Sequence, residues 1–431
     1  MGIVRVSGPL SATIARAILG RLPKARFAAH GFFLDRHGEA LDEGIALLFR
    51  APRSFTGEDV LELQGHGGPV VLDMLLRRTL ELGARPARPG EFTERAFLNG
   101  KLDLAQAEAV ADLVASTSEE AAKLALRAMG GAFSGRVAEL SQQLVQLRAY
   151  VEAMLDFPDD EVDPLDEEKL ARQVRGLLTE LRGIEAGARQ GTMLREGVSL
   201  VIAGPPNAGK STLLNALARR ETAIVTDVPG TTRDVLRELI HIDGLPVHVL
   251  DTAGLRISED PVEREGVRRA WDAVRGADHV LLVIEDEVGV TGEQRAFRCE
   301  LPQSMAITLV RNKIDRTGRP PGCRTGELGM EVSISAKREV GLDLLRGHLK
   351  QALHYRGAGE GVFMARRRHL DALARAGEVL AAGAFEVASG GGLELVAENL
   401  RVAQQSLGEI SGEVANEELL DRIFSEFCIG K

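Results

Sequence analysis

The sequence predicts a multidomain chain of α/β and all-α parts. A small α+β domain comes first, a helical domain follows, and an α/β domain with a mostly parallel sheet is inserted into the helical domain. Length is the first reason, because 431 residues exceed what one ordinary hydrophobic core holds. Periodicity is the second: it is helical before residue 197 and after residue 357, and strand-like runs alternate with helical segments between them. The predicted domains are residues 1–99, a helical domain made of 100–196 and 358–431, and the insertion at 197–357.

The first domain alternates short apolar runs with one helical segment. Runs at 3–6, 45–49 and 60–63 predict strands, and residues 69–82 predict a helix. The joint Gly65-His66-Gly67-Gly68 precedes this helix. A tight turn explains the joint better than an anion site, because no Lys-Ser pair follows the glycines.

Long amphipathic helices are predicted from residue 101 onward. Apolar residues recur at helical spacing, as at Leu140, Leu144 and Leu147, and an acidic stretch with Pro158 at 156–161 interrupts the pattern. That stretch is expected to be a solvated loop rather than a metal site. The basic cluster from Arg366 to His369 is interpreted as a solvated helix start rather than a contact for a phosphate backbone.

The insertion has the pattern of a parallel α/β sheet. Strands are predicted at 198–203, 239–242, 247–250, 280–284, 307–310 and 332–334, and Asp243-Gly244 predicts a hairpin turn. The first of these strands runs into Gly204-Pro205-Pro206-Asn207-Ala208-Gly209-Lys210-Ser211 and then into a helical segment. A glycine-rich turn between a strand and a helix directs backbone N–H groups at one anion, which is the arrangement of a phosphate loop. Lys210 is expected at the outer phosphates and Ser211 on Mg²⁺.

Four further clusters follow the phosphate loop in a fixed order. The loop at 229–234 offers a threonine hydroxyl for Mg²⁺, and Asp251-Thr252-Ala253-Gly254 places a carboxylate and a glycine near the γ-phosphate. Asp315 of Asn312-Lys313-Ile314-Asp315 can accept hydrogen bonds from N1–H and the exocyclic amine of guanine, and 335–337 completes the base side. These clusters together predict a Ras-like P-loop GTPase domain, hence a GTP hydrolase. The predicted GTP-binding residues are Asn207, Ala208, Gly209, Lys210, Ser211, Thr212, Thr226, Asp227, Val228, Pro229, Gly230, Thr231, Thr232, Asp251, Thr252, Ala253, Gly254, Asn312, Lys313, Asp315, Ser335, Ala336 and Lys337.

Leu255 occupies the position at which many GTPases carry the glutamine that orients the attacking water. Two interpretations stay open on the residues alone. One is a slow GTPase that needs an external activator. The other is a substitute carboxylate combined with a monovalent cation such as K⁺, which would neutralise transition-state charge as an inserted arginine does.

The composition excludes several classes of site and location. Only three cysteines occur, far apart, so neither a disulfide framework nor a zinc site is expected. A net charge of −10 argues against non-specific coating of nucleic acid. No targeting segment and no apolar run long enough to span a membrane is recognised, so a cytoplasmic location without membrane attachment is expected.

With these residues assigned, the chain closely resembles the bacterial tRNA-modifying GTPase family known as MnmE or TrmE. The motifs that carry the resemblance are Gly2-Ile3-Val4-Arg5-Val6-Ser7-Gly8, Phe55-Thr56-Gly57-Glu58-Asp59, Gln64-Gly65-His66-Gly67-Gly68, the stretch 88–101, the five GTPase clusters and the terminal Phe427-Cys428-Ile429-Gly430-Lys431. The stretch 284–304 matches the family only loosely and is expected to be a surface loop. The resemblance also implies that about twenty residues before Gly2 are missing, which would leave Arg5 less supported.

The resemblance implies a first domain that binds a tetrahydrofolate derivative, in its 5,10-methylene or 5-formyl form, and forms a homodimer. It places the folate contacts on Arg5, Glu62, Lys101 and Lys431. From sequence alone, each of these would be a surface charge at a turn or helix end.

The resemblance also assigns the remaining chemistry of the insertion and the tail. It implies that K⁺ is held by Asn207, Thr226, Val228 and Thr231, that Thr232 joins Ser211 on Mg²⁺, and that Glu263 is the substitute catalytic carboxylate. Cys428 is the further catalytic candidate, because a thiol near Lys431 can have a lowered pKa, although most isolated cysteines are inert.

The function implied is a K⁺-stimulated GTPase whose GTPase domains dimerise when GTP binds and are reset by hydrolysis. With an FAD- and NADH-dependent partner protein, in a heterotetramer, it would add an aminomethyl or carboxymethylaminomethyl group to C5 of the wobble uridine of certain tRNAs. The alternative is a GTP-driven assembly or signalling switch that modifies no base.

Overall fold

The computed structural model describes residues 1–156, 167–218, 237–251, 271–272, 274–357, 359, 361–390, 392–414, 417–425 and 427. Its elements are β1 (Gly2–Ser7), α1 (Ser11–Leu19), β2 (Ala29–Leu34), β3 (Ala40–Phe49), β4 (Val60–Gly65), α2 (Pro69–Glu81), α3 (Glu91–Leu98), α4 (Leu104–Ala115), α5 (Glu119–Met129), α6 (Ala132–Asp156), α7 (Glu167–Glu196), β5 (Val198–Ala203), α8 (Lys210–Ala218), β6 (Arg237–Ile242), β7 (Leu245–Asp251), β8 (His279–Glu285), α10 (Gly292–Glu300), β9 (Ile307–Asn312), α11 (Ile314–Thr317), β10 (Gly322–Gly326), β11 (Gly329–Ser333), α12 (Leu342–Ala352), α13 (Arg367–Ser389), α14 (Leu393–Ser411) and α15 (Glu417–Ser425).

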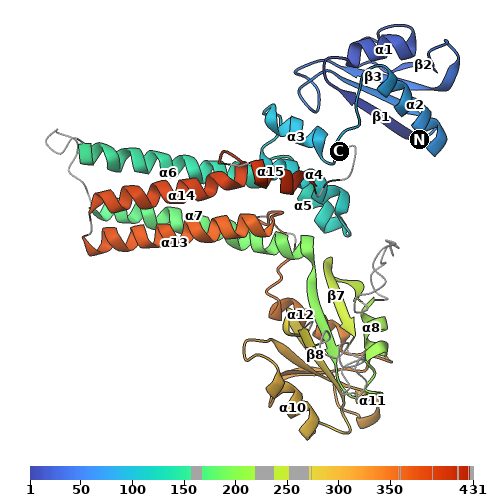
Figure 1. Ribbon diagram of the computed structural model, residues 1–431. Helices are drawn as coiled ribbons and strands as arrows, with labels where there is room; N and C mark the ends of the chain where they lie inside the picture. Colours follow the sequence, from blue (N-terminus) through green and yellow to red (C-terminus); the bar gives the residue numbers. More distant parts are fainter. Residues whose placement is uncertain are drawn as a thin grey trace. The chain divides into compact units, whose positions relative to one another are not determined.

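The chain divides into two compact units. The first contains Met1–Val114, Leu126–Leu181 and Asp371–Lys431, and the second contains Ala115–Ala125 and Arg182–Leu370. The fold class expected from the sequence is confirmed, with an antiparallel-sheet domain, a helical domain and an inserted domain with a mostly parallel sheet (Figure 1). None of the helices in the described part of the chain is long and apolar enough to cross a membrane.

The N-terminal domain is a four-stranded antiparallel sheet in the order β1-β4-β3-β2. Alternating apolar residues of the strands form one buried face, to which α1 contributes Ile14 and Ile18 and α2 contributes Leu75. Strand β1 is hydrogen-bonded to β4 along one edge. Its buried face packs against the helices, which bury their apolar sides on the same core. Arg5, in the middle of β1, faces Glu62 of β4 in the strand register.

The helical domain follows the predicted periodicity. Helix α6 buries Leu140, Leu144 and Leu147 at the expected spacing, and α14, which lies beside α6 in Figure 1, buries Val396, Leu400 and Leu407. A smaller core joins α4 to the C-terminal helix α15 and Phe427. The prediction of a solvated start for α13 holds for Arg367, which is exposed, but is wrong for Arg366 and His369, which are 9% and 2% exposed. The N–H of Arg366 donates to Nδ1 of His369 at 3.1 Å.

The inserted domain is a seven-stranded sheet in the order β10-β11-β9-β8-β5-β7-β6. Its central strands are parallel, and only the edge strands β6 and β10 run antiparallel to their neighbours. Strands β5, β8 and β9 are almost wholly buried, as expected for a parallel sheet covered on both faces. The carboxyl ends of β5, β8 and β9 therefore lie at one edge of the sheet, where loops of α/β domains bind ligands.

Candidate functional site

The phosphate loop connects the end of β5 to the start of α8, as the sequence predicts. Asn207 has φ 65°, and Gly204 and Gly209 have φ 140° and 92°, so the loop adopts a backbone that glycine and asparagine accept most easily. Ammonium Nζ of Lys210 donates to the carbonyl oxygens of Gly204 at 2.9 Å and Pro205 at 3.0 Å. Ser211 is exposed at the first turn of α8, where the free N–H groups of a helix N-terminus favour anions.

The glycines of this loop are required by close approach as well as by backbone conformation. A Cβ at Gly204 would overlap the carbonyl oxygen of Val283 in β8, and a Cβ at Gly209 would overlap the side-chain amide of Asn312. The loop is therefore packed directly onto the ends of β8 and β9. Any larger residue at either position would push the loop away from the sheet.

Asn312, at the end of β9, joins three loops. Its Nδ2 donates to the carbonyl oxygen of Ala208 in the phosphate loop at 2.8 Å. Its Oδ1 accepts from the N–H groups of Lys313 at 2.8 Å and Ala336 at 3.0 Å. Asn312 is only 2% exposed, so these bonds are made away from water, where hydrogen bonds are stronger and unpaired groups are costly. The structure thus brings the phosphate loop and the predicted base-reading loops together.

Asp315 lies on the one-turn helix α11, immediately after β9. Its Oδ1 accepts a hydrogen bond from Oγ of Ser335 at 2.6 Å. This bond, together with the nearby Arg338 and Arg316, lowers the pKa of Asp315 below its ordinary value despite the opposing effect of burial. The carboxylate is therefore charged at neutral pH, as an acceptor for N–H donors of a base must be. Lys313 forms an ion pair with Glu285 at 2.7 Å, and Lys337 is exposed.

Thr212, also predicted to bind GTP, is exposed in the first turn of α8, and the remaining predicted nucleotide and metal residues lie outside the described residues. These are Thr226, Asp227, Val228, Pro229, Gly230, Thr231, Thr232, the side chain of Asp251, Thr252, Ala253, Gly254 and Glu263. Where the structure describes the chain, no three His, Cys, Asp or Glu side chains converge to hold a metal ion. A Mg²⁺ site of one or two hydroxyls with nucleotide phosphates does not require such a cluster, and the exposed Ser211 hydroxyl fits that donor set.

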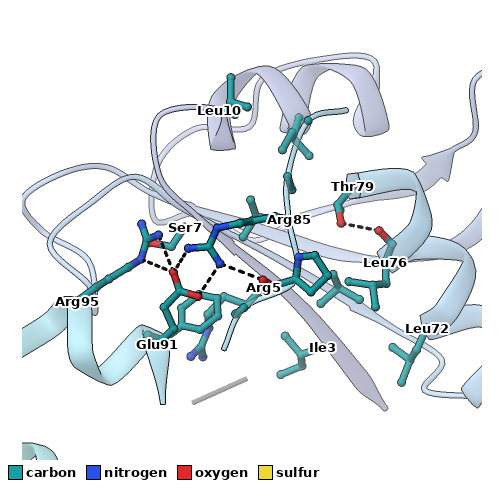
Figure 2. A pocket seen from close by; sticks show the side chains of 18 of the residues that line it. Ile3, Arg5, Ser7, Leu10, Leu72, Leu76, Thr79, Arg85, Glu91 and Arg95 are labelled. Atoms are coloured by element: carbon teal, nitrogen blue, oxygen red, sulfur yellow. Dashed lines mark hydrogen bonds and ion pairs between the residues drawn. The ribbon is translucent and has the colours of Figure 1, made fainter. Parts of the chain in front are cut away.

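A second candidate site is a cavity of about 630 Å³ in the N-terminal domain, lined by residues of β1, α2 and the segment before α3 (Figure 2). Arg5 lines it and pairs with Glu62, from Nε to Oε1 at 2.9 Å. The guanidinium carbon of Arg5 lies 5.9 Å from the ring centre of Phe55 and 5.6 Å from that of Phe92. Of the predicted folate residues, Arg5 and Glu62 are thus in contact. Lys101 donates to the carbonyl oxygen of Pro52 at 3.1 Å and is not part of the lining, and Lys431 lies outside the described residues, as does Cys428.

Sequence reasoning missed the charged cluster that closes one side of this cavity. Glu91, 4% exposed, accepts hydrogen bonds from Arg85 and Arg95 (Figure 2). Arg95 also donates to Glu58 at 2.9 Å and 3.0 Å. The bonds from Arg85 lower the pKa of Glu91 to about 2, against the effect of burial. The signal was present in the sequence, because Glu91 and Arg95 are four residues apart at the start of a helix and face one another there.

Sequence reasoning also misjudged the stretch 284–304. Only part of it is a surface loop: it contains the end of β8 and helix α10, and Asp286 is 7% exposed. The carboxylate of Asp286 contacts Thr317 and Arg319, which follow Asp315 along the chain. A charged residue directly after a buried strand run could have indicated a role at the carboxyl edge of the sheet.

The inserted domain defines the class of protein: a phosphate loop after β5, an inner strand of a mostly parallel sheet, joined by Asn312 to an Asn-Lys-x-Asp loop, is the nucleotide site of a P-loop GTPase. Two family models together match almost the whole chain. "GTP-binding protein TrmE N-terminus" matches residues 1–101 and "MnmE helical domain" matches residues 104–428. The chain belongs to the tRNA modification GTPase MnmE family.

Curated relatives agree along the whole length. The tRNA modification GTPases MnmE of Aeromonas hydrophila and Aeromonas salmonicida are each 55% identical over 439 residues, covering 100% of this chain and 96% of the relative. The enzyme of the same name from Sodalis glossinidius is 55% identical over 436 residues, with the same coverage. The family resemblance inferred from the motifs is thus confirmed.

Proposed function

We propose that this chain is a GTPase that acts in tRNA modification. The observation that carries the proposal is the Asn312 side chain, which joins the phosphate loop at Ala208 to the base loop at Ala336 in a chain 55% identical to tRNA modification GTPases over its full length. Such a connection couples the place where phosphates bind to the place where the base is read. The protein acts in the cytoplasm, where its tRNA substrates are.

GTP binds at the carboxyl edge of the seven-stranded sheet. Lys210 leaves the loop carbonyls to reach the outer phosphates, and the N–H groups of the loop and of α8 bind the phosphate oxygens. Ser211 and Thr232 hold Mg²⁺, which neutralises charge on the phosphates when bound. Asp315 reads guanine, supported by Ser335, and Lys313 and Ala336 border the base. Residues 226–232 and 251–254 complete the site on the γ-phosphate side.

Hydrolysis uses K⁺ and Glu263. Asn207, Thr226, Val228 and Thr231 would hold K⁺, and Asn207 is exposed on the phosphate loop, where an ion beside the phosphates is accessible to it. K⁺ supplies positive charge near the phosphates when bound. Glu263 orients the attacking water in place of the glutamine that Leu255 replaces.

The N-terminal cavity binds a tetrahydrofolate derivative that donates the one-carbon unit. Its volume of about 630 Å³ suits a bicyclic ligand with a side arm, and Arg5 with Glu62 offers paired polar groups beside the aromatic Phe55 and Phe92. Lys101, which lies outside the lining, and Lys431 are kept in this proposal only because the family resemblance implies them. Cys428 provides the thiol for the modification chemistry on C5 of the wobble uridine, carried out with an FAD- and NADH-dependent partner protein.

The chain works as a homodimer formed through the N-terminal domain. Apolar side chains on β1 and α2 remain exposed there, with Ile3 at 53%, Val70 at 69% and Leu76 at 42%. Ile3 and Leu76 both line the cavity, and exposed apolar side chains that share one surface favour an interface. Their position beside the folate cavity places the dimer contact and the one-carbon site on the same domain.

The dependence of GTP turnover on the monovalent cation tests the hydrolysis mechanism. In full-length protein, replacing NaCl with KCl at equal ionic strength should raise the GTP hydrolysis rate by at least about tenfold, because one fixed positive charge is added at the transition state. Equal rates in the two salts would remove the K⁺ assignment. GTP turnover that is undetectable in both salts would contradict the assignment of GTPase activity to this chain.

A further inference from the structure

We propose that Asp286 is a positioning residue for guanine recognition, which holds the carboxyl end of α11 and so fixes where Asp315 presents its carboxylate. The inference rests on the proposed role of Asp315 in reading the base. No part of the phosphate loop or of the family motifs includes Asp286.

Asp286 contacts both flanks of the base-reading motif. Its N–H donates to the carbonyl oxygen of Asn312 at 2.9 Å, on the amino side of α11. Its Oδ2 accepts from Oγ1 of Thr317 at 2.6 Å and from Nε of Arg319 at 2.9 Å, on the carboxyl side. One residue at the end of β8 therefore connects the two ends of the segment that carries Asp315.

Helix α11 needs such anchors because it has only four residues, Ile314–Thr317. A single turn gains too few hydrogen bonds to be stable by itself. On its amino side it is held by buried Ile314, whose N–H donates to the carbonyl oxygen of Ile334 at 3.2 Å, and by the bond from Ser335 to Asp315. The hydrogen bonds of Asp286 to Thr317 and Arg319 stabilise the carboxyl end of α11 in the same way.

The charge of Asp286 is stabilised where it lies. Its side chain is 1% exposed, and a buried carboxylate is costly unless cations neutralise it. Oδ1 lies 2.8 Å from Nε of Arg319 and 3.7 Å from Nη1 of Arg311. Burial raises the pKa of Asp286, but the Thr317 hydroxyl and the two guanidinium groups outweigh it and lower the pKa below its ordinary value.

The same network predicts that the domain tolerates removal of this carboxylate. Arg311 keeps a second partner, Glu331, with Nε 2.7 Å from Oε2. The side chain of Arg319 is 35% exposed and can be hydrated. Asp286→Ala should therefore fold and release the carboxyl end of α11, without leaving a buried cation unpaired.

The test compares two nucleotides that differ at one hydrogen-bond donor. IDP lacks the 2-amino group of GDP, so the ratio of the dissociation constants of IDP and GDP reports how well Asp315 is placed. In full-length Asp286→Ala, titration calorimetry should show GDP binding weakened by about tenfold or more and the ratio reduced toward one, since charge-assisted hydrogen bonds are lost. Asp286→Asn, which can still accept from Thr317, should restore part of the ratio.

A loss of folded protein alone would weaken both nucleotides equally and leave the ratio unchanged. An unchanged ratio in Asp286→Ala would therefore overturn the inference. Glu327→Ala is the matched control, because it removes an exposed carboxylate of the same domain, one that forms an ion pair with Arg295 at 2.6 Å. It should leave the dissociation constants of GDP and IDP unchanged. Asp315→Asn tests the underlying assignment separately: it should shift preference from GDP toward XDP, and if it does not, the role of Asp315 fails whatever Asp286 does.

Discussion

Among single residues, a buried histidine, His279, makes the stability of the inserted domain sensitive to acid. His279 at the start of β8 is 1% exposed, and its Nε2 lies 2.8 Å from Oγ1 of Thr308, which in turn lies 2.7 Å from Nε2 of His348 on α12. Burial, with a smaller contribution from the charge of His348, lowers the pKa of His279 to about 4. The fold therefore favours the neutral ring.

This pair predicts the pH dependence of stability. Below the ordinary histidine pKa of about 6.5 His279 is protonated in the unfolded chain, whereas in the folded chain it stays neutral until about pH 4. The free energy of unfolding should therefore fall as pH decreases from 6.5 to 4, by up to about 3 kcal/mol. Urea unfolding followed by tryptophan fluorescence measures this, because the chain has one tryptophan, Trp271, which packs in the core of the same domain. His279→Gln should flatten the pH dependence, whereas His37→Gln, at an exposed site, should not. A wild-type free energy of unfolding that is constant from pH 7 to pH 5 would contradict this account.

At the scale of elements, α7 carries a groove made by its own glycines. A Cβ at Gly187 would overlap the carbonyl oxygen of Gly361, and a Cβ at Gly191 would overlap that of Phe363. The segment 361–365 is thus seated on the helix, with the N–H of Phe363 donating to Gly187 at 3.2 Å and Thr192 donating to Ala365 at 3.0 Å. This segment leads from the inserted domain back into the helical domain.

Gly191→Ala should therefore unseat the segment, since the obstructing atoms are backbone and cannot turn aside. The expected result is faster hydrogen exchange at the amide of Phe363 and a free energy of unfolding that is lower by about 1–3 kcal/mol. Gly183→Ala is the matched control on the same helix, because its Cβ meets nothing within 4 Å, and it should be neutral or slightly stabilising. If the Phe363 amide exchanges equally slowly in both variants, the segment 361–365 is not held by its close approach to Gly191.

Most elements were predictable from sequence where the apolar pattern is strong. The strand at 198–203 was predicted to the residue, and the hairpin at Asp243-Gly244 is confirmed by the pairing of Ile242 with Leu245. Patterns missed β10, whose sequence Gly-Cys-Arg-Thr-Gly has no apolar run and which is held by its pairing with β11 and by Arg324 on Glu331. They also missed the edge strand β2 and the short helix α1. For β10 tertiary contacts outweigh weak local propensity, whereas the helical spacing of Ile14, Ala15 and Ile18 in α1 was present in the sequence.

The candidate sites were predictable to a similar degree. Motifs identified the phosphate loop and Asn312 because chemistry there depends on local spacing. Asp286 and Arg85 are positioned by contacts that the fold makes, and the sequence carries only weaker signals for them: the four-residue spacing of Glu91 and Arg95, and a charge directly after a buried strand.

At the scale of the whole molecule, the exposed apolar residues of the N-terminal domain predict a dimer. Leu76→Glu places a charge on helix α2 beside the cavity and should convert the protein to a monomer in light-scattering measurements, because burying an unpaired carboxylate at the interface is costly. Leu395→Glu, at a 55% exposed position of the helical domain, should leave the dimer intact. A dimeric Leu76→Glu protein would place the interface elsewhere.

Mass analysis of tRNA nucleosides shows whether this GTPase cycle serves the modification of tRNA. In a strain that lacks the gene, the wobble uridine should lose its aminomethyl or carboxymethylaminomethyl group at C5. The wild-type chain should restore it, and Lys210→Ala, present in equal amount by immunoblot, should not, because the phosphate loop then lacks the ammonium that reaches the nucleotide. An unchanged wobble uridine in the deletion strain, or full restoration by Lys210→Ala, would contradict the account and favour a GTP-driven switch that modifies no base.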